Sequence, residues 1–207
     1  IGTDGKIQSI AFREPLESMR LIEEFMIMAN VAAAETLEQA RQPLIYRVHE
    51  EPSKEKLLAF SDYLRTIAIP FSKGQVMKPA VFNRILERAR GTPHQEVIND
   101  VVLRTQAQAV YDTNNVGHFG LNLARYAHFT SPIRRYPDLI VHRALIRARH
   151  LGDDGLSDAQ VARLKSVADH ISMTERRAMA AERDSVDRYV AAYMQDRVGA
   201  VFKGRIT

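Results

Sequence analysis

The 207-residue chain contains no cysteine. This absence excludes disulfides, thiolate metal ligands and a cysteine nucleophile, so a metal ion would need oxygen or imidazole ligands. No hydrophobic run approaches the roughly 20 residues that a membrane-spanning helix needs. Residues 1–14 also lack the charged start and apolar centre of a signal peptide. We therefore expect a cytoplasmic protein that makes no use of a membrane.

The length and composition fit a globular fold. Hydrophobic residues make up 45% and charged residues 26% of the chain, as in ordinary domains with a core of their own. The chain does not begin with Met, and residues 6–12 and 198–207 both alternate like strands. We interpret both ends as cut, and expect a piece of a longer protein.

Positive charge is concentrated in one stretch of the sequence. The 29 basic residues comprise 22 Arg and only 7 Lys. Residues 104–150 hold seven Arg against Asp112 and Asp138, a local surplus of five charges. Because guanidinium groups suit phosphate, this stretch predicts a surface for a nucleic-acid backbone. An arginine content that reflects only the base composition of the genome is the alternative.

Helical patterns dominate the rest of the chain, while residues 112–131 break the helical period and predict a loop with one or two strands. Capping boxes are expected at Thr92–Gln95 and Ser157–Gln160. The pattern therefore predicts an α+β, mainly helical fold. The expected helices cover residues 16–40, 53–69, 79–90, 93–111, 137–150 and, with a bend, 157–196.

One polar constellation lies in an otherwise apolar helix. Residues 25–34 are apolar at nine of ten positions, the exception being Asn30, so we expect nearly every face of this helix to be buried. Arg20, Glu23 and Asn30 share one side at a period of 3.6 residues. A buried polar group must be paired. The pattern fits either a structural network or a polar substrate, and both stay open.

A second constellation covers residues 126–138. Pro132 and Pro137 restrict the backbone, so Arg134 and Arg135 lie on a short, stiff element beside a helix start, which favours an anion site. Aromatic residues interleaved with this charge suit stacked bases, although we expect at least three of the five to serve core packing. These five are Tyr111, Phe119, Tyr126, Phe129 and Tyr136.

Long motifs at residues 22–30, 46–50, 117–121 and 126–138 resemble the catalytic domain of the ribonuclease II and ribonuclease R family, most closely its ribonuclease R branch. The resemblance spans nearly the whole chain. It implies that residues 1–197 are the C-terminal part of an RNB catalytic domain, its mainly helical half with a few strands. Residues 198–207 resemble the first strand of an OB-fold RNA-binding barrel.

The resemblance implies a parent protein that hydrolyses single-stranded RNA processively from its 3′ end to nucleoside 5′-monophosphates, as a monomer. The family holds Mg²⁺ on a cluster of aspartates that this chain lacks, so the ligands are expected in a preceding part and none in this chain. The fragment alone is then expected to be inactive. The alternative is an RNA-binding fragment or module without catalytic activity, and a helical scaffold without RNA affinity is a third reading.

The resemblance also implies roles for single residues. Arg134 and Arg135 would hold the scissile phosphate, and Glu23 would meet the terminal ribose, where helix phase favours it over Glu24. A carboxylate facing a phosphate backbone should weaken the grip, so Glu182 would only modulate binding. The expected RNA-binding residues are Glu24, Asn30, His118, Tyr126, Thr130, Ser131, Tyr136 and Glu182.

Overall fold

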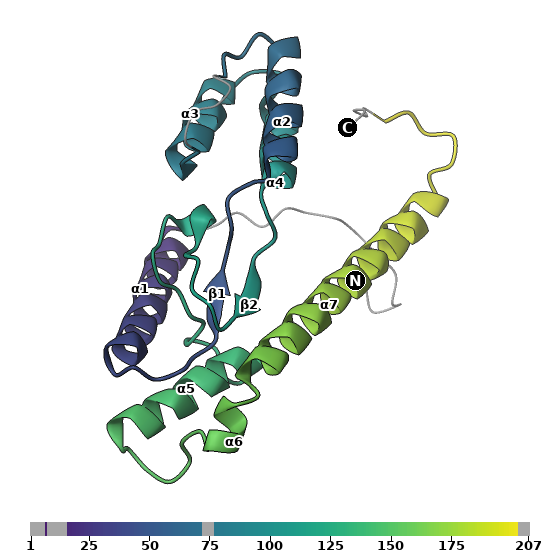
Figure 1. Cartoon of the computed structure of the whole chain (residues 1–207). Helices are drawn as coiled ribbons and strands as arrows, with labels where there is room; N and C mark the ends of the chain where they lie inside the picture. Colours follow the sequence, from purple (N-terminus) through teal and green to yellow (C-terminus); the bar gives the residue numbers. More distant parts are fainter. Residues whose placement is uncertain (1–6, 8–15, 72–76, 203–207) are drawn as a thin grey trace.

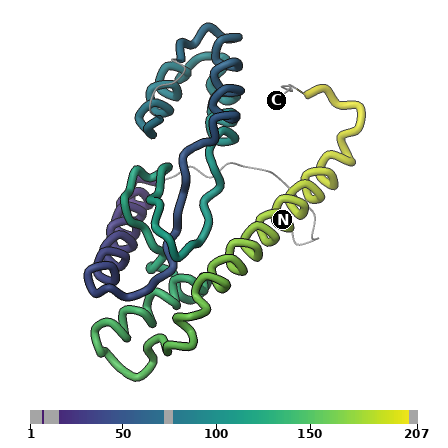
Figure 2. Tube along the Cα trace, in the orientation of Figure 1, coloured from purple at the N-terminus to yellow at the C-terminus, as the bar shows by residue number. Residues whose placement is uncertain are grey.

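The computed structural model describes residues 7, 16–71 and 77–202. A body, a helical lobe and a long diagonal helix make up the described part (Figures 1 and 2). The body contains α1 (Glu17–Gln39), β1 (Tyr46–Val48), β2 (Val110–Asp112), a 3-10 helix (Phe119–Leu121) and α5 (Tyr136–Arg149). The lobe contains α2 (Lys54–Thr66), α3 (Pro79–Ala89) and α4 (Gln95–Thr105), and the chain continues through α6 (Asp158–Val161) into α7 (Leu164–Gln195).

The mainly helical α+β prediction is confirmed, and most helix bounds differ from it by only a few residues. The Ser53 hydroxyl accepts a hydrogen bond from the Lys56 N–H at the start of α2. Ser157 and Gln160 form the predicted capping box, and the predicted bend is the break between α6 and α7. The strand expected at residues 6–12 lies, apart from Ile7, outside the described residues. Residues 198–202 form no strand, while 203–207 lie outside the described ranges.

Two predictions around the lobe are wrong. The capping box at Thr92 does not form, because the Thr92 hydroxyl donates to the Ala89 carbonyl and the Gln95 amide oxygen accepts from the Gly91 N–H. The helix therefore starts only at Gln95. It also ends at Thr105 instead of reaching Tyr111, because residues 110–112 pair with β1 as a strand.

The strand expected around Phe119 is likewise a 3-10 helix, with two isolated bridges, one between His49 and His118 and one between His118 and Leu123. The Gly120 N–H donates to Nδ1 of His49, and a Cβ at this position would lie 2.8 Å from that nitrogen. Only glycine allows this close approach.

β1 is the centre of the body. It pairs antiparallel with β2, with Arg47 opposite Tyr111. On its other side, the Arg47 N–H donates to the Tyr126 carbonyl and the His49 N–H to the Gly117 carbonyl. Residues 117–126 therefore run along β1. This places the loop that contains Gly117, and Tyr126 at the start of residues 126–138, at one edge of the body.

Two separate cores stabilise the described structure. The core of the body joins the second half of α1 to β1, β2, α5 and the start of α7, with Leu37, Ile45 and Val141 among its fully buried residues. The core of the lobe is centred on Phe60 and Phe82. The Phe82 ring meets Phe119 edge-on at 6.2 Å, so the lobe also contacts the 3-10 helix.

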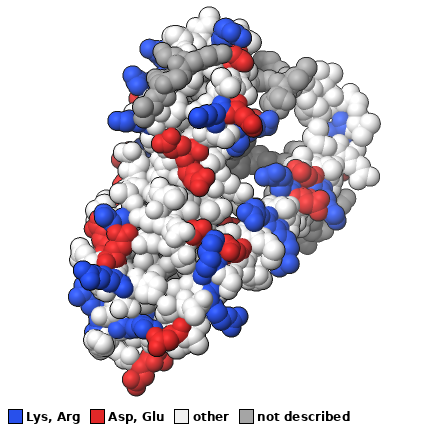
Figure 3. Space-filling model, in the orientation of Figure 1, with Lys and Arg blue, Asp and Glu red and all other residues white. Residues whose placement is uncertain are grey.

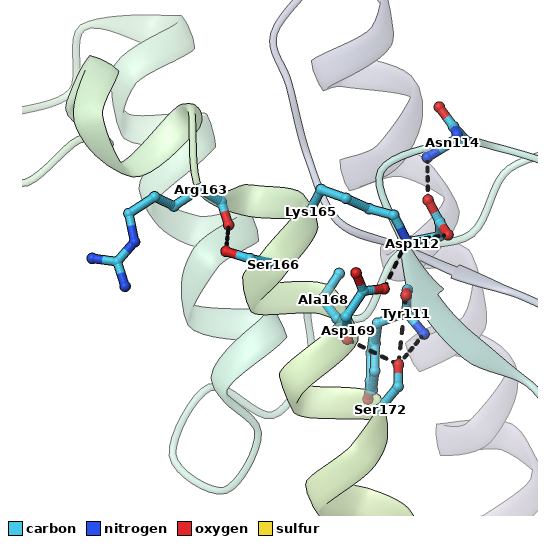
Figure 4. Close-up of polar contacts among 9 residues, drawn as sticks. All are labelled: Tyr111, Asp112, Asn114, Arg163, Lys165, Ser166, Ala168, Asp169 and Ser172. Carbon is cyan, nitrogen blue, oxygen red and sulfur yellow. Dashed lines mark hydrogen bonds and ion pairs between the residues drawn. The ribbon is translucent and has the colours of Figure 1, made fainter.

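Among the described residues, the first half of α7 is the part that binds the body. The Ser172 hydroxyl accepts from the Tyr111 N–H and donates to the Ala168 carbonyl, and Lys165 bridges Asp112 and Asp169 (Figure 4). Beyond this contact α7 extends away from the body (Figure 1). Among the described helices, none combines the length and hydropathy that crossing a membrane requires.

The expectation that α1 is buried on nearly every face is wrong for its first half. Phe25 is 65% exposed and Met28 62%, whereas Asn30 is 2% exposed and Leu37 fully buried. The helix meets the body core only from Asn30 onward. Arg20 and Glu23 are exposed, and no ion pair joins them within the described structure.

Candidate nucleic-acid interface

Two buried side chains fix the backbone of residues 129–131. The Asn30 side-chain oxygen accepts from the N–H groups of Phe129 (2.8 Å) and Thr130 (3.2 Å), and its amide donates to the Tyr126 hydroxyl at 2.9 Å. Oδ1 of Asp138 accepts from the Ser131 N–H at 2.8 Å. Three consecutive N–H groups thus bind side chains from α1 and α5. For Asn30, the structural network expected as one alternative is present.

The segment continues into the arginine turn, which we define as residues 131–135. The Ser131 carbonyl accepts from the N–H groups of Arg134 and Arg135, and α5 begins directly afterwards with Pro137 in its first turn. The partial positive charge of a helix N-terminus favours an anion here. The sequence-based expectation of a short turn beside a helix start is confirmed.

The two arginines of this turn differ in their surroundings. The Arg135 guanidinium lies 2.8 Å from Oδ1 of Asp138, with its side chain 21% exposed. Arg134 is exposed, and its guanidinium makes no ion pair or hydrogen bond within the described ranges. Only Arg134 is therefore free to bind an anion from solution.

Imidazole and phenol rings pack beneath the turn. The Tyr126 ring meets His118 and His128 edge-on, and Nδ1 of His128 lies 2.9 Å from the Tyr111 hydroxyl. Burial lowers the pKa of His118 to about 4, helped by His49 and Arg47. Burial also lowers the pKa of His128 to about 3, helped by Arg135 and Arg47. Both imidazoles are therefore neutral near pH 7.

Four of the five aromatics serve packing, which confirms the expectation of at least three. Tyr111 and Tyr126 are buried, and Phe129 and Phe119 pack against the two cores. Tyr136 is 52% exposed and follows the arginine turn directly, so it is the ring best placed for stacking on a base. The hydroxyls of the half-buried Thr130 and Ser131 bind no other described residue.

The predicted acidic residues Glu23, Glu24 and Glu182 are not part of the cluster that residues 126–138 form with Tyr111 and His118. Glu23 and Glu24 lie on the exposed first half of α1. Glu182 lies on the exposed second half of α7, seven residues or about 10 Å beyond Glu175, the last residue of that helix seen to bind the body. The RNA contacts expected of all three stay predictions.

Next to the cluster is a cavity of about 690 Å³ between α3, α4, the 3-10 helix and α7. Its walls are mainly apolar, with Phe82, Val102 and Met179 among them, and His49 and His118 also line it. His118 also lines a second cavity of about 570 Å³. Nδ1 of His118 accepts from the Leu121 N–H, so the proton of the neutral ring is on the other nitrogen, which is a donor.

The predicted basic surface of residues 104–150 is partly neutralised in three dimensions. Acidic residues from outside this stretch pair with Arg104 (Asp100, one turn earlier on α4), Arg125 (Glu35 and Glu38) and Arg147 (Asp158). Basic and acidic side chains accordingly alternate on the face shown in Figure 3. The charge surplus along the sequence is thus partly neutralised in space, while Arg134, Arg143 and Arg149 form no ion pair within the described structure.

Residue-based reasoning missed Asp138 and Arg47 as parts of this site. Arg47 forms a 2.6 Å ion pair with Glu175 and lies 4.5 Å from the centre of the Tyr111 ring, which ties α7 to the cluster. An Asp in the first turn of a helix, three residues after an Arg, was the available signal for Asp138. No spacing links Arg47 to Glu175, because their contact is made only by folding.

The described residues do not fit a magnesium site. Among them, no group of three or more His, Asp or Glu side chains is placed to hold a metal ion. Asp138 already binds Arg135, and the exposed Glu23 and Glu24 have no further carboxylate beside them to complete a ligand set. The expectation that magnesium ligands come from another part of a longer protein stays a prediction.

Comparison with known proteins shows the family. The model of the RNB domain matches residues 2–150. This chain belongs to the RNB domain family. It is 39% identical to ribonuclease R of Escherichia coli over 98% of its length and 26% of that protein, and 43% identical to ribonuclease R of Aquifex aeolicus over 91% and 26%. The chain thus spans about a quarter of these relatives.

Solved structures agree. Apo ribonuclease R of Mycoplasma genitalium superposes with a TM-score of 0.81 at 29% identity, covering 88% of this chain and 29% of that one. The same enzyme bound to double-stranded RNA gives 0.82 at 30% identity, covering 91% and 34%. The resemblance to the ribonuclease R branch is confirmed.

Proposed function

We propose that this chain is the RNA-gripping half of the catalytic domain of a 3′-to-5′ exoribonuclease. The whole protein hydrolyses single-stranded RNA processively to nucleoside 5′-monophosphates. The observation that carries the proposal is the exposed Arg134 guanidinium on a turn anchored by Asn30 and Asp138 at the N-terminus of α5. Support comes from the relatives named ribonuclease R and from the RNA-bound Mycoplasma structures, one with ribose-methylated single-stranded RNA.

Each side chain has a defined task in this proposal. Arg134 binds the scissile phosphate and offsets the charge that grows in the pentavalent transition state, and the α5 N-terminus adds partial positive charge. Tyr136 stacks on a base. Glu23 accepts a hydrogen bond from the 2′-hydroxyl of the terminal ribose, the group that separates RNA from DNA.

Three further features belong to the proposal. The whole protein uses Mg²⁺ held by residues outside this chain, it acts as a monomer, and it works in the cytoplasm. The isolated chain, whose described residues hold no group of carboxylates for a metal, binds single-stranded RNA without cleaving it. By itself, this chain would therefore behave as an RNA-binding module.

The test uses 5′-labelled single-stranded RNA with a 3′ tail. The whole protein with Mg²⁺ should release nucleoside 5′-monophosphates and leave a short labelled end product, even when excess unlabelled RNA is added after binding. The isolated chain should release none. Internal cleavage products from the whole protein would contradict the exoribonuclease proposal. Mononucleotide release by the isolated, magnesium-supplemented chain would contradict the proposal that the Mg²⁺ ligands lie outside this chain.

A further inference from the structure

Two buried polar atoms at the arginine turn have no hydrogen-bond partner within the described structure, namely Nε of Arg135 and Oδ2 of Asp138. Asp138 is fully buried. A buried ion pair is a weak source of net stability, because desolvation offsets most of the attraction. The contribution of this pair must therefore be sought in the conformation that it imposes.

The hydrogen bonds show which conformation that is. Oδ1 of Asp138 accepts from the Ser131 N–H at the start of the turn and from the Arg135 guanidinium at its end, both at 2.8 Å. One carboxylate oxygen thus ties both ends of the turn to the first turn of α5. The residues between them are pushed outward: Ile133 is fully exposed and Arg134 is exposed.

We propose that Asp138 is a positioning residue that holds the arginine turn so that Arg134 meets the phosphate. We call its hydrogen bonds to Ser131 and Arg135 the brace. Arg135 is part of this brace instead of binding phosphate. The inference rests on the proposed function and deepens it. It gives the two arginines different roles, whereas the resemblance implied phosphate binding by both. A donor fixed in advance stabilises a transition state better than one that must first be ordered, so the brace acts on turnover more than on affinity.

The test is a mutant cycle in the whole protein. Asp138→Asn keeps the size of the side chain and an acceptor for Ser131 but removes the ion pair. We expect kcat to fall about 10-fold or more, with KM within about 2-fold, because one preorganised donor is worth roughly 100-fold or more in turnover. In an Arg134→Ala background, Asp138→Asn should cause no further loss. Asp158→Asn, which removes an exposed ion pair to Arg147, is the matched control and should leave kcat unchanged.

A merely structural role predicts another pattern. Equal losses of kcat from Asp138→Asn with and without Arg134 would overturn the inference, as would unchanged kcat in a folded Asp138→Asn protein. If Asp138→Asn melts below the assay temperature, Arg135→Gln takes its place in the same cycle. A further loss from Arg135→Gln in the Arg134→Ala background would contradict the assignment of Arg135 to positioning Arg134.

Failure of the proposed function has a separate signature. A wild-type whole protein that releases no mononucleotides contradicts the proposed function and removes the basis of the inference with it. An active protein in which Arg134→Ala has full turnover contradicts only the role of Arg134 and its brace.

Discussion

Residues 126–138 and the first half of α1 carry most of the predicted site residues. The first region is held by buried side chains, whereas the second is exposed. In the first region, buried side chains of Asn30 and Asp138 bind consecutive backbone N–H groups. In the second, Glu23 stands on a helix whose apolar residues, such as Phe25, are exposed. The described residues thus complete the proposed phosphate-binding part of the site but leave the predicted ribose-binding part on an open helix surface.

The largest effect is expected in the region that is complete. Arg134→Ala in the whole protein should lower turnover at least about 100-fold, or roughly 3 to 4 kcal/mol, because preorganised charge at the reacting phosphate is lost. Affinity for long RNA should change little, since one phosphate contact is lost among many. Single-turnover hydrolysis and equilibrium binding measure the two effects. Arg149→Ala, an exposed arginine at the end of α5, is the control. Equal losses of turnover from both variants would mean that the total positive charge of the protein, and not the position of Arg134, determines turnover.

Asn30→Ala should show that the same region depends on buried polar anchors. The change leaves the N–H groups of the half-buried Phe129 and Thr130 without their acceptor. At about 1 to 3 kcal/mol for each orphaned group, we expect the free energy of unfolding to fall by about 3 kcal/mol. Urea denaturation of the chain measures it. Glu24→Ala, on the exposed half of α1, should stay within about 0.5 kcal/mol of wild type, and a comparable loss there would remove the contrast.

Glu23→Ala tests the open region by function. Because Glu23 is exposed, stability should change by less than about 0.5 kcal/mol. The preference of the whole protein for a ribose over a deoxyribose at the 3′ end should fall by about 10-fold, the value of one hydrogen bond to a charged group. Hydrolysis of matched substrates that differ in one 2′-hydroxyl measures this preference. An unchanged preference would take Glu23 out of the site.

The parts that could be predicted depend on residues close together in the sequence. Motifs and caps act over a few residues, so the turn at Pro132, the start of α5 and the Ser157 capping box followed from neighbouring residues. Asn30 was recognised because a lone amide in an apolar helix needs partners, although the sequence could not choose between protein and substrate. The structure supplies protein partners at residues 126–130.

The rest depends on contacts between distant residues. Charge along residues 104–150 was partly neutralised by acids such as Glu38 and Asp158, which no local count includes. Val110–Asp112 is a strand only because β1 lies beside it. Similarly, apolar composition predicted that the first half of α1 is buried, but burial needs a neighbouring element, and none of the described elements covers it.

A smaller effect concerns the neutral imidazoles below the turn. The pKa of His118 is about 4 in the folded chain, below the ordinary value of about 6.5. The unfolded chain therefore binds a proton first as pH falls, so the free energy of unfolding should decrease between about pH 6.5 and 4. His118→Asn, which keeps an acceptor for the Leu121 N–H, should flatten this slope in denaturation series. His150→Asn, an exposed position with φ of 52° that Asn tolerates, should leave it unchanged.

Amide hydrogen exchange of the isolated chain, followed by NMR, tests the contrast between the two regions most directly. The N–H groups of Phe129, Thr130 and Ser131 lie in no helix or strand but bind buried side chains. They should therefore be protected about 100-fold or more over an unstructured chain, like amides of the body core. The N–H groups of Glu23 and Glu24, on the open half of α1, should exchange faster than those three. Exchange of all three at the rate of an unstructured chain would contradict the claim that residues 126–138 are already ordered before RNA binds.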